Sequence, residues 1–154
     1  MDEQIKQTKL RKYRDILYIV GTAFIIFGAW SLIQLFLYLT IRRDEMDLVA
    51  EASGFSGMIW LFYVILAAAV VIDVVLHFYI GLSARSESKT GKRHRAYIVL
   101  TFIPFITYLG GLLLTVLSIS EYALFTYVAS ILIYLTSLFF CFEIIFVGIK
   151  VKRL

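Results

Sequence analysis

Four long apolar runs dominate this chain, and they limit how it can fold more than any other feature. Each run exceeds the roughly 20 residues that an α-helix needs to cross the hydrocarbon core of a bilayer, which is about 30 Å thick. Few charges lie within the runs, as expected for segments in lipid, where charge is costly. We therefore predict four transmembrane helices, at residues 16–41, 57–83, 96–119 and 122–149.

The composition agrees with a membrane protein. The chain is 61% hydrophobic and 17% charged, whereas soluble domains are about half apolar and a quarter charged. We predict an all-α polytopic membrane protein, a four-transmembrane-helix bundle over residues 16–149, flanked by basic tails at 1–15 and 150–154. The first tail could be solvated, which is the commoner case, or form an amphipathic helix on the membrane.

The basic residues predict an orientation. Of the 15 Lys and Arg residues, 13 lie in the two tails and in a flexible basic loop over residues 84–95, and two lie in the loop over residues 42–56. By the positive-inside rule, both termini are cytoplasmic, and we expect a bacterial plasma (inner) membrane. The basic flanks suit anionic lipid headgroups. No aromatic-interleaved basic patch indicates nucleic acid.

Asp73 and His77 form the sharpest candidate site. They lie four residues apart in the second run, so both side chains leave one face of a helix. Ionisable residues inside a membrane span indicate a functional site by default, and His titrates near neutral pH. The alternative is structural: Asp73 binds His77 or a neighbouring hydroxyl group and thereby fixes helix packing.

Glu143 in the fourth run is a third candidate. The predicted orientation puts it at a depth similar to that of His77, so the two could meet if the second and fourth helices are neighbours. Equally, Glu143 could reach up to Lys150, Arg153 or Arg14 near the headgroups. One imidazole and two distant carboxylates are a weak metal set, so we predict no metal site.

Small and special residues predict how the later helices pack. Pro104 predicts a kink, because it lacks a backbone donor and its ring clashes with the carbonyl of Leu100; the Thr101 hydroxyl could satisfy a freed group. Thr107 and Gly111 suit close helix packing. Ser120 and Glu121 alone link the third run to the fourth, which predicts an antiparallel hairpin.

No catalytic motif or cofactor fingerprint is present, and Cys141 lies in an apolar run where thiols are usually inert. We therefore expect neither an enzyme nor a bound cofactor. The leading hypothesis is a small membrane protein that acts through helix-helix assembly, as a homo-oligomer or as a subunit with another membrane protein. The alternative is a proton- or cation-coupled transporter or channel that uses Asp73, His77 and Glu143.

Overall fold

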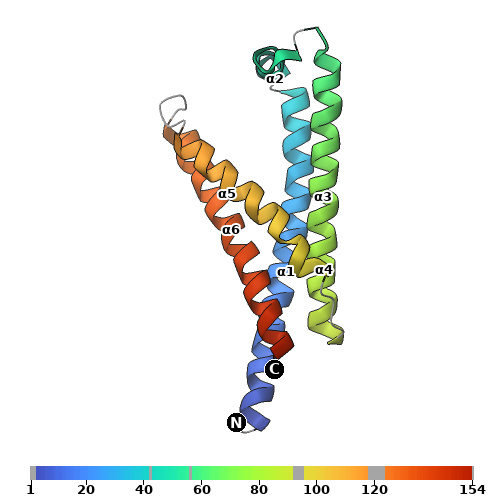
Figure 1. Cartoon of the computed structure of the whole chain (residues 1–154), viewed down its shortest axis with the longest axis vertical. Coiled ribbons are helices and arrows are strands. Elements are labelled where there is room, and N and C mark those ends of the chain that lie inside the picture. Colours follow the sequence, from blue (N-terminus) through green and yellow to red (C-terminus); the bar gives the residue numbers. More distant parts are fainter. Residues whose placement is uncertain (1–2, 42, 56, 92–95, 118–123, 154) are drawn as a thin grey trace. The chain divides into compact units, whose positions relative to one another are not determined.

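The computed structural model describes residues 3–41, 43–55, 57–91, 96–117 and 124–153. Its regular elements in these ranges are all helices, with no strand among them, which confirms the predicted all-α class. In chain order they are α1 (Glu3–Thr40), α2 (Arg43–Ala50), a short π-helix η1 (Glu51–Phe55), α3 (Ile59–Thr90), α4 (Ala96–Leu100), α5 (Phe102–Leu117) and α6 (Leu124–Arg153) (Figure 1).

Four helical stretches are long and apolar enough to cross a membrane, and they overlap the four predicted runs. The third stretch combines α4 and α5, and the other three lie in α1, α3 and α6. The number of apolar helices long enough to span is thus confirmed. The four stretches are Glu3–Leu37, Ile59–Thr90, Ala96–Leu117 and Tyr127–Val151.

The helices extend beyond the predicted boundaries. α1 begins at Glu3 rather than at residue 16, because residues 3–15 contain helix-forming Lys, Arg, Gln and Leu without Gly or Pro. The predicted loop over residues 42–56 contains α2 and η1. The predicted flexible loop over residues 84–95 is helical up to Thr90, which corrects that prediction. There Gly91, at φ 68°, ends α3 and donates its N–H to the Glu87 carbonyl over 2.9 Å.

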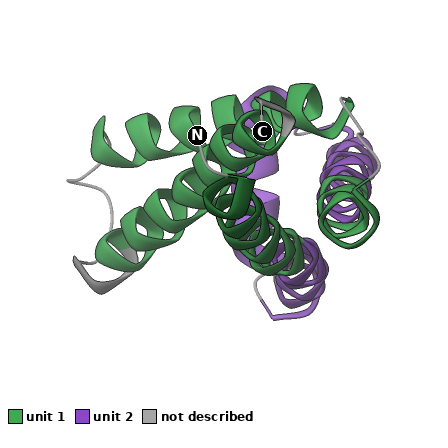
Figure 2. Cartoon of the chain, turned by 90° about the horizontal axis from the view of Figure 1, so that it is seen from below, with its two compact units in different colours: residues 1–24, 79–154 green, residues 25–78 purple. Residues whose placement is uncertain are grey.

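The chain divides into two compact units (Figure 2). Unit 1 contains residues 1–24 and 79–154, and it has a core that α1, α3, α4 and α6 share. Each long helix contributes side chains three or four residues apart, so each buries one stripe. The buried apolar residues are Leu17, Val20 and Phe24 of α1, Ile80 and Ala84 of α3, Tyr97 and Ile98 of α4, and Cys141, Ile144, Val147 and Val151 of α6.

Glycine lets helices approach closely inside unit 1. A Cβ placed on Gly21 of α1 would lie 2.8 Å from the backbone oxygen of Gly81 in α3. A Cβ on Gly111 of α5 would lie 2.7 Å from the ring of Tyr134 in α6. α5 and α6 pack along each other, as the predicted hairpin requires (Figure 1). Its predicted turn, Ser120 and Glu121, lies outside the described residues.

The third stretch is interrupted at Thr101, one turn before Pro104. Both hydrogen-bond donors of Thr101 are satisfied at this interruption. Its N–H and its hydroxyl both donate to the Tyr97 carbonyl, over 2.9 and 2.7 Å. Pro104 has no N–H to donate to the Leu100 carbonyl. The Thr101 hydroxyl does not replace this donor, because it donates to Tyr97. Thr101 and Pro104 are both buried, so the interruption lies inside unit 1.

Unit 2, residues 25–78, is built differently. The second half of α1 and the first half of α3 lie antiparallel, with α2 and η1 between them in the chain. Only Gly28, Ala50 and His77 are buried among the described residues of this unit. Its long helices thus expose most of their apolar surface, which a soluble protein would bury.

Candidate functional site

Three polar side chains meet between α1 and α3 in unit 2. Ser31 of α1 donates its hydroxyl to Oδ2 of Asp73 in α3 over 3.0 Å. Oδ1 of the same carboxylate lies 3.3 Å from Nδ1 of His77, one turn further along α3. The two predicted residues are therefore together, and a hydroxyl from the neighbouring helix joins them. We call Ser31, Asp73 and His77 the polar cluster.

The hydrogen bonds of His77 define its tautomer. Its Nδ1 lies 2.8 Å from the backbone oxygen of Asp73. Because a carbonyl oxygen can only accept, we assign a proton to Nδ1, which then faces both the carbonyl and the carboxylate of Asp73. The side chain is 1% exposed. A Cβ on Gly28 would lie 2.9 Å from the His77 Cβ, so this glycine makes room for the imidazole.

Asp73 is placed differently from its partner. Its side chain remains 38% exposed, although it lies within the long, mainly apolar part of α3. Ser31 cannot satisfy it fully, since the same hydroxyl also lies 3.3 Å from the Phe27 carbonyl. A carboxylate with two donors and a free side can accept a further hydrogen bond or a cation. The polar cluster thus holds Asp73 in place and leaves part of it accessible.

Glu143, the third predicted residue, lies in a different unit from the polar cluster. It belongs to α6 in unit 1, where it is partly buried, and no hydrogen bond or ion pair to it is present among the described residues. Lys150, one of the proposed partners, instead has its ammonium 5.4 Å from the centre of the Phe146 ring. The hypothesis that His77 and Glu143 meet concerns both units and stays a prediction.

Sequence reasoning missed two polar residues, one in each unit. The first is Ser31 of α1. It lies three residues after Gly28, so both residues are on the face of α1 toward α3, and this spacing is the sequence pattern that could have indicated it. The other is Glu87, which is 0% exposed in unit 1 and lies beside Tyr97. Glu87 is seven residues after Ile80 and would have been placed on the buried stripe if α3 had been extended past residue 83.

A second polar contact in unit 2 attaches α2 to α3. The Tyr63 hydroxyl donates to Asp47 over 2.6 Å and lies 3.4 Å from the Arg43 carbonyl. This contact fixes the position of the short helix that follows α1. In the part of the chain that the structure describes, no three His, Cys, Asp or Glu side chains gather as metal ligands.

Comparison with known proteins adds no relative: no family model, no curated protein and no solved structure matches this chain.

Proposed function

We propose that this chain is an integral membrane protein with four spanning helices that acts through helix-helix assembly rather than catalysis. The observation that carries the proposal is the exposure of Asp73 within the mainly apolar part of α3. A charged group at the centre of a membrane helix costs about 3 kcal/mol on insertion scales. Ser31 and His77 offset part of that cost, and a helix of another subunit could cover the rest.

The surface around Asp73 suits a close partner. Ala69 lies one turn before Asp73 on the same face of α3, and it is exposed. Small residues at such positions let two helix backbones approach, and polar groups then hydrogen-bond across the interface. The small number of buried residues in unit 2 supports the same proposal, because such a helix pair has most of its surface available for contact. The partner is either a second copy or another membrane protein.

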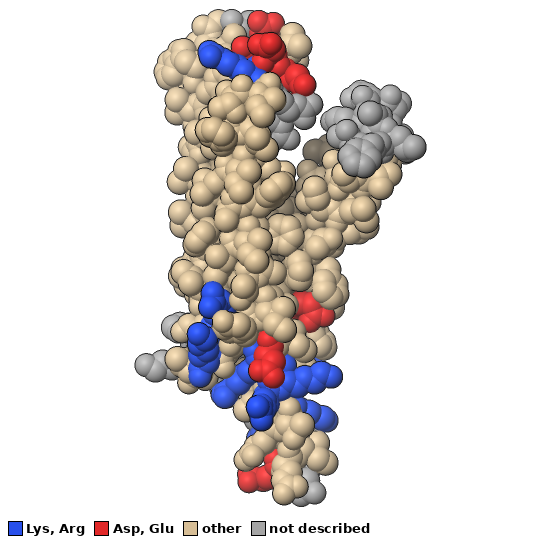
Figure 3. Space-filling view, turned by 180° about the vertical axis from the view of Figure 1, so that it is seen from behind, with Lys and Arg blue, Asp and Glu red and all other residues tan. Residues whose placement is uncertain are grey.

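The orientation belongs to the same proposal. Lys and Arg side chains gather at one end of unit 1, with a few acidic ones among them (Figure 3). Under the positive-inside rule, that end and both termini face the cytoplasm, in a bacterial plasma membrane whose anionic headgroups the cations contact. Reporter domains fused to each end test this. Reporters active on opposite sides of the membrane would contradict four spans.

Bulk introduced beside Asp73 tests assembly directly. Ala69→Phe should block close approach and weaken association at least tenfold. Val71→Phe adds a ring on another face of α3, where Val71 is 54% exposed, and should change association less than twofold. Energy transfer between labelled copies in lipid nanodiscs measures self-association, and co-purification from native membranes reveals a different partner. Equal effects of the two variants on both measurements would refute the proposed interface.

Proton- or cation-coupled transport is the second candidate, and the accessible side of Asp73 favours it. Asp73→Asn keeps the shape of the side chain and its acceptor for Ser31 while removing the charge. In reconstituted vesicles, a pH-dependent flux that disappears in Asp73→Asn would support transport that uses the polar cluster. A parent protein that assembles and carries no flux would exclude it.

A further inference from the structure

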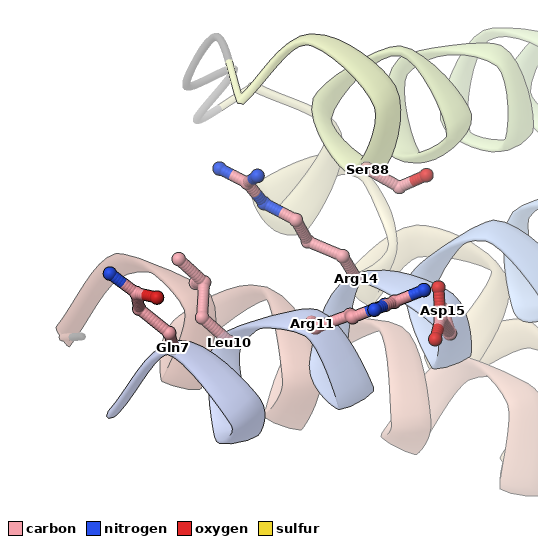
Figure 4. Close-up of a pocket in the computed structure, with 6 residues that line it drawn as sticks. All are labelled: Gln7, Leu10, Arg11, Arg14, Asp15 and Ser88. Carbon is pink, nitrogen blue, oxygen red and sulfur yellow. The ribbon is translucent and has the colours of Figure 1, made fainter. Parts of the chain in front are cut away.

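Unit 1 contains a groove of its own. It has a volume of about 400 Å³, and its lining comes from two helices (Figure 4). We call it the arginine groove; its lining residues are Gln7, Leu10, Arg11, Arg14 and Asp15 of α1 and Ser88 of α3. Figure 4 shows Gln7, Leu10 and Arg14 pointing from α1 into the same space, toward the end of α3.

Arg14 gives the groove its chemistry. Its Nε is buried and has no hydrogen-bond partner among the described residues. The other end of the guanidinium fits against Gly91, where a Cβ would lie 2.7 Å from Nη2. The guanidinium therefore lies beside the turn that ends α3, and no described acceptor meets its Nε. Because Nε itself is closed off, an anionic acceptor would bind the other N–H groups of the guanidinium, which points into the groove (Figure 4).

The rest of the lining adds donors and a net positive charge. Arg11 and Arg14 against Asp15 leave one positive charge, and the Gln7 amide and the Ser88 hydroxyl are neutral donors. More cations lie on α3 nearby, held on the Tyr18 ring. The Arg85 guanidinium is 4.9 Å from that ring centre and donates to the Tyr18 hydroxyl over 3.1 Å, and Lys89 is 5.3 Å away. They raise the local potential without lining the groove.

We propose that the arginine groove binds the phosphate group of an anionic phospholipid. Arginine matches phosphate oxygens with paired N–H donors, and basic pockets between membrane helices bind such headgroups. The inference rests on the proposed membrane insertion, under which the groove lies at the cytoplasmic headgroup level. The apolar run of α1 starts at Ile16, directly after Asp15, and Leu10 gives the groove an apolar wall for the lipid glycerol region.

Lipid retention in nanodiscs tests the site. The full chain is placed in phosphatidylcholine discs containing a few per cent of phosphatidylglycerol, and native mass spectrometry counts the phosphatidylglycerol retained per chain. Arg14→Gln should weaken retention more than tenfold, since it removes charge-assisted hydrogen bonds. Arg11→Gln should also weaken retention, although it alters an exposed residue and leaves the contact of Arg14 with Gly91 intact.

Matched controls separate a built site from general surface attraction. Lys12→Gln also removes one positive charge, on the residue next to Arg11, but it leaves the groove lining unchanged. It should weaken retention by at most the contribution of one surface cation, about fivefold. Asp15→Asn removes the repelling carboxylate and should strengthen retention, whereas Glu3→Gln on the same helix should not. Lys12→Gln and Arg14→Gln acting equally, or a parent chain that retains no phosphatidylglycerol, would overturn the site.

Competition with inorganic phosphate tests whether the ligand is a lipid headgroup or a free phosphate compound. If millimolar phosphate leaves retention unchanged, the ligand is the lipid headgroup; if it displaces the lipid, a free phosphate compound is the ligand and the lipid assignment is wrong. The test is independent of the proposed assembly. A chain that fails to enter nanodiscs refutes membrane insertion itself, whereas a chain that enters and assembles but retains no lipid refutes only the groove.

Discussion

Adding one methyl group to Gly111 should loosen the packing of α5 on α6, and its neighbour offers a matched control. A Cβ at Gly111 would lie 2.7 Å from two ring atoms of Tyr134, where ordinary contact begins at 3.4 Å. A Cβ at Gly110 would meet nothing within 4 Å. The Tyr134 ring also lies against that of Tyr108, with the ring centres 6.4 Å apart, so turning it aside would disturb this second contact.

The size of the effect follows from comparing the two alanine variants. Both gain the same helix propensity, up to about 1 kcal/mol, so that contribution cancels. Only Gly111→Ala must also separate the helices by part of an ångström, and overpacking of this kind costs about 1–3 kcal/mol. We therefore expect Gly111→Ala to be less stable than Gly110→Ala by about that amount.

Equilibrium unfolding in mixed detergent micelles, followed by circular dichroism, measures the difference. Truncating the facing ring should relieve the clash, so Tyr134→Leu should cost less stability in the Gly111→Ala background than in the parent chain. Equal stability of the two alanine variants, or no coupling between positions 111 and 134, would refute the close packing of α5 on α6.

Three further substitutions test other contacts. Gly21→Ala should destabilise unit 1 by about 1–3 kcal/mol in thermal unfolding, because the added Cβ meets the backbone oxygen of Gly81, which no rotation can move; a neutral result would contradict the close approach. Ser31→Ala removes a donor to the carboxylate on α3 and should cost about 1 kcal/mol more than Thr22→Ala, whose hydroxyl bonds only within α1; equal costs would count against the polar cluster. Tyr63→Phe should speed amide hydrogen exchange in α2, and unchanged exchange would mean that this hydroxyl does not hold the helix.

Hydrophobic patterning located the four apolar helices but not their ends. Transfer into lipid depends on long apolar runs, and these are visible in any window of about 20 residues. Helix ends depend on local propensity, which continues through the charged residues 3–15 and stops at Gly91. Residues 84–90 are mostly polar, which is typical of a loop. Ala84 and Glu87 are buried, but their three-residue spacing forms a buried stripe only if α3 continues through them.

The candidate site could be predicted in part. Helical spacing alone put Asp73 and His77 on one face, because that relation is local. Ser31 comes from another helix, and a single hydroxyl in an apolar run does not reveal which helix it faces. The exposure of Asp73 beside a buried His77 could not be predicted either, because burial depends on how α1 packs on α3.

The burial of Cys141 has a practical consequence. Its thiol is 0% exposed among the apolar side chains of unit 1, and the chain contains one cysteine. A water-soluble maleimide should therefore leave the folded protein unlabelled and modify it once the core of unit 1 opens. The native chain thus carries its own reporter of unfolding, and probe sites can be introduced elsewhere without first removing a reactive background.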